Sequence, residues 1–147
     1  MPKQAEQLQQ KIRVSIPLSE AMQFSIIELN PRAILVQAPL EPNLNIHGTG
    51  FAGSIYSLAA LTGWALSTHI MEWNRMQGEL VVARAEIKYR SPITDAIQCR
   101  TQASEEDCET FRKGFESRGK SRLALEIEVG DTKNAILWAT YMAVSKV

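Results

Sequence analysis

Residues 49–71 form a run of 23 positions without an Asp, Glu, Lys or Arg, and this run limits the fold more than any other part of the chain. Its length is sufficient to span a bilayer, so a membrane helix is the first alternative. Three glycines, several serines and threonines, and His69 argue against that alternative. Apolar residues cover most of the circumference of a helix over residues 51–73: Phe51, Ile55, Leu58, Ala59, Ala65, Leu66 and Ile70. We therefore expect a helix that is buried on most sides.

A helix of this kind needs a sheet wrapped around it, and alternating patterns predict the strands. Residues 80–91 alternate most clearly, with one set consisting of Val81, Ala83, Ala85, Ile87 and Tyr89 and the other of Val82, Arg84, Glu86, Lys88 and Arg90. We expect an apolar and a charged face there. Further strands are predicted at residues 24–29, 33–40, 97–103, 123–129 and 135–144.

Two helices are predicted outside the central one. Ala5, Leu8, Ile12 and Ile16 recur at helical spacing, which predicts an amphipathic helix that ends at Pro17. A second helix is expected over residues 104–118, because Ser104 is a suitable N-cap before three acidic residues and Gly119 is a suitable end. The predicted fold class is therefore α+β in a single domain over residues 1–147, which is enough chain for one core.

Composition excludes several classes of function. Lys plus Arg and Asp plus Glu number 16 each, so no overall field favours nucleic acid or an anionic membrane. Cys99 and Cys108 are nine positions apart without a CxxC, so we expect free thiols and no metal or other cofactor. The polar N-terminus has no apolar signal core, and we expect a cytoplasmic protein.

Three segments resemble acyl-CoA thioesterases of the hotdog fold, in which an antiparallel sheet wraps around a long helix. They are NIHGTGFAGSIYSLAAL at residues 45–61, EIKYRSPI at residues 86–93 and RGKSRLALEIEV at residues 118–129. The extra helix before Gly119 makes the chain most similar to the bacterial thioesterase domain that is sometimes fused to acetyltransferases, the YiiD C-terminal type. The resemblance implies a thioester of coenzyme A or acyl carrier protein as substrate, and a homodimer or dimer of dimers.

The resemblance transfers to individual residues only in part. Asn45 matches the Asn of the thioesterase motif and Gly53 matches its second Gly. Phe51 stands where the motif has His, Ala60 where it has the catalytic Asp, and Val82 where it has a water-positioning Ser. The usual acid or base of the family is therefore missing.

Thioester hydrolysis requires hydrogen-bond donors at the developing oxyanion, and the backbone amides of Gly50 to Gly53 at a helix start are suitable donors. The alternative is that these glycines only form a tight loop.

His47 is the nearby side chain suited to act as a base, although a loop role is the simpler interpretation. Asn45 is a candidate for orienting water, or else it bonds its own turn. Glu86 is a candidate from a neighbouring subunit, and its alternative is pairing with Arg84 or Lys88 on a polar face.

Basic residues predict where the phosphates of a carrier bind. Arg90 and Ser91 end the matched strand, and the other members of the predicted substrate-binding set are Arg118, Gly119, Lys120, Ser121 and Arg122. A plain basic turn after a helix is the alternative. Trp64 and Trp73 are expected to line an acyl tunnel or, more simply, to pack in the core.

Three functions remain open on the sequence. Hydrolysis of an acyl thioester at a dimer-interface site is the leading one, and a non-catalytic acyl-thioester binding module is the second, because the family Asp is lost. Hotdog dehydratase or hydratase chemistry ranks last, since His47 has no local carboxylate and His69 lies too far along the helix.

Overall fold

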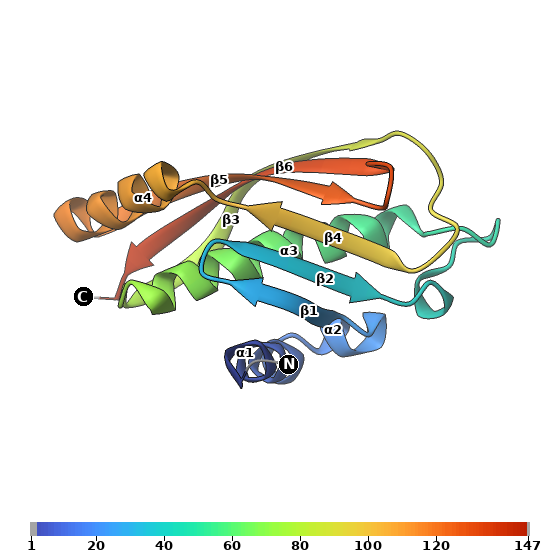
Figure 1. Cartoon of the computed structure of the whole chain (residues 1–147), viewed down its shortest axis with the longest axis horizontal. Coiled ribbons are helices and arrows are strands. Elements are labelled where there is room, and N and C mark those ends of the chain that lie inside the picture. Colours follow the sequence, from blue (N-terminus) through green and yellow to red (C-terminus); the bar gives the residue numbers. More distant parts are fainter. Residues whose placement is uncertain (1–2, 147) are drawn as a thin grey trace.

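Helix α3 (Ala52–Trp73) is the central element of the computed structural model, which describes residues 3–146 (Figure 1). Its buried side chains include Ile55, Leu58, Leu66 and Ile70, as the apolar run predicted. Mean hydropathy is nevertheless insufficient for a transmembrane segment in any helix of residues 3–146. The buried-helix interpretation of the uncharged run is therefore confirmed.

One six-stranded antiparallel sheet wraps around α3 in the order β1-β2-β4-β5-β6-β3. The strands are β1 (Ser25–Asn30), β2 (Ala33–Ala38), β3 (Gly78–Tyr89), β4 (Ile97–Gln102), β5 (Lys120–Val129) and β6 (Ala135–Ser145). All six lie within a few residues of their predicted bounds. The arrangement is the predicted α+β hotdog fold.

The N-terminal helix protects one edge of the sheet. Helix α1 (Lys3–Ser15) packs beside β1, where Gln9 Oε1 accepts a hydrogen bond of 2.7 Å from the backbone N–H of Ile26. Arg13 Nη2 donates to the carbonyl of Phe24 at 2.8 Å. These side chains take the place of a neighbouring strand, so β1 is not free to pair with another chain.

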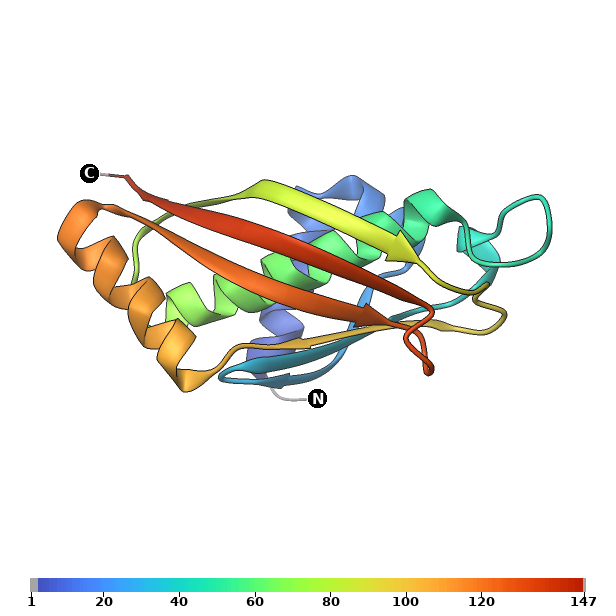
Figure 2. The same cartoon turned by 90° about the horizontal axis from the view of Figure 1, so that it is seen from above.

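The opposite edge strand, β3, has no such cover within residues 3–146. It pairs with β6 on one side only, and Figure 2 shows it along the margin of the sheet. Val81 and Val82 are each about half exposed there, at 51% and 45%. A strand of 12 residues with a free edge and exposed valines is suited to pairing with a second chain.

Because of a β-bulge, the observed faces of β3 differ from the predicted ones. The register with β6 shifts between Val82 and Arg84, so Ala83 is the additional residue and the alternation reverses there. Val82 pairs with the inward-facing Tyr141, and Val81 pairs with the outer-face residue Met142. Val81 was therefore assigned to the wrong face, because strict alternation does not anticipate an extra residue.

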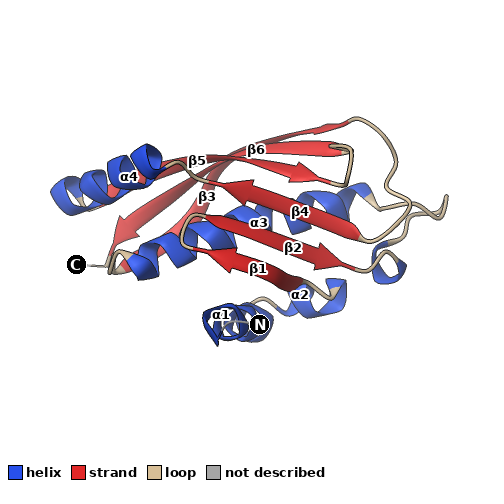
Figure 3. Ribbon diagram, viewed as in Figure 1, coloured by secondary structure: helices blue, strands red, loops and turns tan. Residues whose placement is uncertain are grey.

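Helix α4 (Glu105–Arg118) confirms the predicted insertion between strands. Ser104 Oγ accepts a hydrogen bond from the N–H of Asp107 at 3.0 Å, and Gly119 ends the helix at φ +70°. Phe111 and Phe115 are buried against the sheet. Figure 3 shows α4 and two short elements that were not predicted, α2 (Pro17–Met22) and the 3-10 turn η1 (Glu41–Asn43).

Close packing between α3 and β6 fixes the core. Tyr141 is fully buried, and its hydroxyl donates a hydrogen bond to the carbonyl of Ala60 at 2.7 Å. A Cβ on Gly63 would lie 2.1 Å from that hydroxyl, so only glycine lets the ring pass the helix. This contact ties the middle of α3 to the sheet.

Candidate active site

The loop before α3 is held by one side chain. Asn45 Oδ1 accepts hydrogen bonds from the N–H groups of His47 at 2.8 Å and Thr49 at 3.1 Å. Its Nδ2 group donates to Thr49 Oγ1 at 2.8 Å and to the carbonyl of Gly50 at 3.3 Å. Asn45 thus organises its own turn, which was the alternative role for it, and its amide is occupied by the loop.

The first turn of α3 carries the donors that hydrolysis would need. The N–H of Gly50 bonds the carbonyl of Ile93 at 2.8 Å, and the N–H of Phe51 bonds the carbonyl of Asn43 at 2.8 Å. These two amides are therefore not available. No side chain caps this helix and its first turn holds no acidic residue, so the N–H groups of Ala52 and Gly53 are left without a partner inside the described chain.

Apolar side chains surround this helix start. Phe51 lies so close to the Gly53 backbone that a Cβ there would be 2.5 Å from the ring. Phe51, Leu44 and Ile46 are 51%, 45% and 95% exposed, and they line an open depression of about 650 Å³ together with Asn45 and His47. An apolar rim beside unpaired amides suits a molecule with a carbonyl and a hydrocarbon chain.

His47 lies at the tip of the same loop. Its side chain is exposed and forms no hydrogen bond or ion pair with any of the residues 3–146. The following residue, Gly48, has φ +76°, which turns the chain back toward the helix. The imidazole is therefore accessible, and no carboxylate orients it within the chain.

The end of β3 reaches this helix start, and it brings a residue that sequence reasoning did not select. Tyr89 Oη donates a hydrogen bond to the carbonyl of Ala52 at 2.8 Å. Burial, and to a lesser degree the neighbouring Tyr56, raises the pKa of Tyr89. The similarity of EIKYRSPI at residues 86–93 to the thioesterases indicated this strand end, but only Arg90 and Ser91 were selected from it.

Arg90 and Ser91 continue from Tyr89 into a tight connection. Their N–H groups both bond the carbonyl of Asn134, at 2.8 and 3.1 Å, and Ser91 Oγ accepts from Asn134 Nδ2 at 2.9 Å. The Arg90 side chain is exposed at the same end of the molecule as the α3 start. The end of β3 and the start of α3 therefore lie side by side.

Glu86 lies elsewhere. It pairs in register with Trp138, which is on the outer face of β6, whereas the inward residues of β6 pack on α3. A shallow cleft on that outer face is lined by Glu86, Arg84 and Trp138 among others. Within its own subunit, Glu86 is therefore on the side of the sheet opposite α3.

The second basic group is separated from the helix start. Residues 118–122 lie at the start of β5, level with the first residues of β3 but separated from them by the end of β6, which places them roughly 30 Å along the strands from Tyr89. Ser121 is buried, and Lys120 and Arg122 alternate with it and are exposed on the outer face. Only assembly of two copies can bring these residues to the loop of Asn45.

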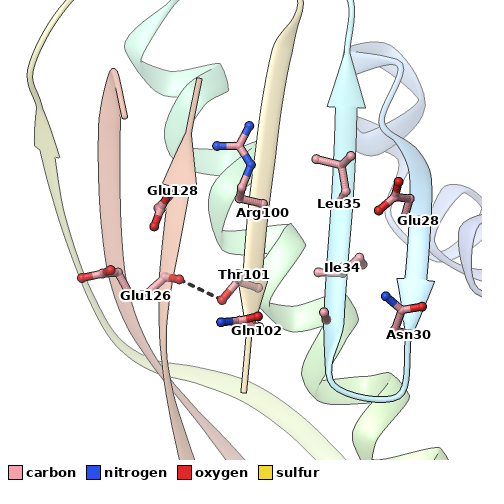
Figure 4. A pocket seen from close by; sticks show the side chains of 10 residues that line it. Glu28, Asn30, Ile34, Leu35, Arg100, Thr101, Gln102, Glu126 and Glu128 are labelled. Carbon is pink, nitrogen blue, oxygen red and sulfur yellow. Dashed lines mark hydrogen bonds between the residues drawn. The ribbon is translucent and has the colours of Figure 1, made fainter. Parts of the chain in front are cut away.

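The cysteines and the possible metal ligands of the described chain do not indicate another kind of site. Burial raises the pKa of the Cys99 thiol to about 12, so this cysteine stays protonated, and both cysteines are free. No group of three metal-ligating side chains occurs in residues 3–146. A cleft of about 560 Å³ lies on the outer face between β1, β2, β4 and β5, and none of the predicted site residues lines it. Figure 4 shows the side chains that line this cleft.

Comparison with known proteins gives one family. The family model described as "Putative thioesterase (yiiD_Cterm)" matches residues 5–144. A crystal structure of a putative thioesterase from Shewanella oneidensis is 31% identical, with a TM-score of 0.87 over 98% of this chain and 99% of that one. A probable thioesterase from Pseudomonas aeruginosa is 21% identical, with a TM-score of 0.80 over 99% and 97%. A Staphylococcus aureus thioesterase mutant is 13% identical, with a TM-score of 0.69 over 87% and 98%. The last two show the shared fold alone.

Proposed function

The chain belongs to this putative thioesterase family, and from that premise we propose that it hydrolyses an acyl thioester carried by coenzyme A or by acyl carrier protein. The observation that carries the proposal is the uncapped start of α3, with the N–H groups of Ala52 and Gly53 unpaired beside an apolar depression. Two adjacent amides at the positive end of a 22-residue helix match the needs of an oxyanion.

The chemistry follows from these groups. Water attacks the carbonyl carbon of the thioester. The carbonyl oxygen then becomes an oxyanion that accepts hydrogen bonds from the N–H groups of Ala52 and Gly53. His47 takes the proton of the water, the C–S bond breaks, and the thiolate leaves with that proton. Phe51, Leu44 and Ile46 contact the acyl chain.

Two further residues position this machinery. Asn45 holds the loop that carries His47, through its two bonds to backbone N–H groups. Tyr89 fixes the first turn of α3 through the carbonyl of Ala52. Neither side chain needs to touch the substrate for this role.

We place the complete site between two subunits. If two β3 edges pair about a two-fold axis normal to the sheet, the strands run antiparallel and the Tyr89 end of one lies beside the Gly78 end of the other. Residues 118–122 of the partner then approach the loop of the first copy. Arg90 of one subunit and Arg118 of the other are thereby available to the phosphates of a carrier, with Gly119 and Lys120 beside them.

This arrangement predicts that the protein is at least a homodimer. One side of α3, next to β3, carries the exposed Tyr56 and the half-buried Ala60 and Trp64, which a second copy would cover. Changing Tyr56 to arginine should halve the particle mass in sedimentation velocity. Leu18→Arg is the control, because Leu18 is 57% exposed on α2 and its change should leave the mass as it is. A wild-type particle of 16.4 kDa at micromolar concentration would contradict the shared site.

Carrier binding is the second prediction. Reversing the charges of Arg90 and Arg118 together should weaken the binding of free coenzyme A by tenfold or more, because charge-assisted hydrogen bonds to phosphate are lost. Titration calorimetry measures the affinity. Lys113→Glu is the matched control, since this exposed lysine of α4 lies outside the proposed site. Equal affinity in the double variant and the control would remove these arginines from the carrier site.

An assay against acyl-CoA and acyl carrier protein substrates of increasing chain length tests the function itself. Hydrolysis of at least one substrate is the expected result.

The second candidate function is a binding module for acyl thioesters. It is favoured by the absence of a carboxylate at position 60, where this chain has Ala60. Binding of acyl-CoA without release of thiol for any chain length would select that module instead. A dehydratase is less consistent, because no carboxylate of residues 3–146 contacts His47.

A further inference from the structure

A cavity of about 400 Å³ lies between α1 and the second half of α3. Helix α3 runs along much of the molecule, with the loop of Asn45 before its first turn and this cavity toward its other end (Figure 1). Residues 53 and 69 of this helix are separated by roughly 24 Å along its axis. The cavity is therefore separate from the candidate oxyanion site of the same chain. Apart from Leu8, its lining consists of Gln4, Gln7, Lys11, His69, Glu72 and Trp73.

His69 is the buried polar residue of this cavity. It is 5% exposed, and its ring nitrogens form no hydrogen bond with any other of the residues 3–146. Burial lowers the pKa of His69, and the charge of Glu72 opposes this effect only in part. The imidazole is therefore uncharged at neutral pH, with one ring nitrogen as a donor and the other as an acceptor. A buried imidazole without a partner in the chain is suited to bind a polar ligand.

Trp73 adds an aromatic surface next to His69. The indole is 58% exposed, so the expectation that this tryptophan packs in the core was wrong. The ring centroids of His69 and Trp73 are 6.4 Å apart, and the two ring planes are inclined by 48°. Two neighbouring rings inclined in this way can contact a flat ligand on its face with one ring and at its edge with the other.

The charges on the cavity wall cancel, and this disfavours a charged ligand. Lys11 Nζ lies 3.4 Å from Glu72 Oε1, so an ion pair links the α1 wall to the α3 wall. An anion would be repelled by Glu72, and a cation would be repelled by Lys11.

A wholly apolar ligand is also unsuitable. It would cover the imidazole and the amide groups of Gln4 and Gln7 without replacing their hydrogen bonds to water, which is costly. The class that remains is an uncharged molecule with a flat face and with donors and acceptors along its edge.

We infer that this cavity binds the base of a purine nucleoside, with one face on the indole of Trp73 and its nitrogen-bearing edge at His69. A purine has hydrogen-bonding atoms around a flat ring system, and its two fused rings cover more of an indole than a single ring does. The amides of Gln4 and Gln7 both donate and accept, so they are suited to the base or to the ribose hydroxyls. The volume of the cavity is typical of small-molecule sites. None of these residues takes part in the proposed thioester hydrolysis.

Adenosine is the probe, because it carries a purine base and no charge. NMR of the histidine rings observes the site directly, since the chain has two histidines and His47→Ala assigns their signals. Adenosine should shift the ring signals of His69 and leave those of His47 in place, with a dissociation constant below roughly 1 mM. The inference is overturned if millimolar adenosine leaves the signals of His69 unchanged. It is also overturned if the signals of His47 shift instead, because the nucleoside would then bind at the candidate active site.

Two substitutions test the two rings separately. His69→Phe keeps a flat buried ring without nitrogens, and Trp73→Leu removes the exposed indole. Each should weaken adenosine binding by about tenfold or more in titration calorimetry. Trp138→Leu is the matched control, because Trp138 is 41% exposed but lies on the outer face of the sheet.

Circular dichroism checks the folding of these variants. If His69→Phe does not fold, Trp73→Leu decides alone, because its side chain is exposed. Wild-type affinity in a folded Trp73→Leu variant would overturn the inference.

The same base is part of coenzyme A, so a parallel titration with coenzyme A distinguishes the two sources. If a free nucleoside is the ligand, His69 should respond to adenosine alone, because the phosphates of coenzyme A are disfavoured beside Glu72. A response to both compounds would support the purine site and identify the adenine of the carrier as a ligand. A response to coenzyme A alone would contradict the inference, because the base would then not be what the cavity recognises.

Discussion

Replacing His47 with alanine should lower the turnover of a good acyl-CoA substrate by roughly a hundredfold, the usual scale for removing a general base. The imidazole is exposed at the tip of the loop that contains Asn45, so the change removes no packing and no hydrogen bond of its side chain. The affinity for substrate should hardly change. Steady-state kinetics separates the two quantities.

Asn45→Ala is the comparison that distinguishes chemistry from loop structure. It removes the acceptor for the N–H groups of His47 and Thr49, so turnover and thermal stability should both fall. His47→Ala should lower turnover alone. If the His47 variant keeps full activity, His47 is a loop residue and another group activates the water.

Tyr141→Ala should give the largest loss of stability, roughly 3–5 kcal/mol in the free energy of unfolding. The ring is fully buried between β6 and α3, and Gly63 leaves no Cβ that could fill the resulting cavity. Urea unfolding followed by circular dichroism measures the change. Tyr141→Phe is the control, because it keeps the ring and removes only the hydrogen bond to Ala60, which is worth about 1 kcal/mol. Equal losses in both variants would show that packing is not the cause.

Stability at alkaline pH should depend on the same residue. Burial, with a smaller contribution from Tyr56, raises the pKa of Tyr141 above its ordinary value of 10.0. The unfolded chain therefore loses this proton first as the pH rises, so the contribution of Tyr141 to folding stability should be constant below pH 10 and fall above it. The Tyr141→Phe variant should lose less stability than wild type between neutral pH and pH 11, measured by urea unfolding at each pH. Equal losses in the two proteins would contradict this origin.

The elements of the fold could be predicted because their signals are local. The uncharged run at residues 49–71 predicts a buried helix, and the cap at Ser104 and the end at Gly119 bound α4 from neighbouring residues alone. The family match over residues 5–144 agrees with the resemblance drawn from three short segments. Periodicity failed at Ala83, where one additional residue reverses the faces of β3, because a bulge depends on the partner strand.

The candidate site shows the same division. The sequence by itself determined which segments carry polar chemistry: the loop around Asn45 and His47, the strand end at Arg90 and the basic turn at Gly119. Tertiary structure alone decided which backbone amides of the α3 start are already bonded, through the carbonyls of Ile93 and Asn43. It also decided that Tyr89 meets the first turn of α3 and that Glu86 lies across the sheet from that helix. The physical reason is that hydrogen-bond partners and sheet faces are set by residues far apart in the chain, whereas helix periodicity and capping depend on residues a few positions away.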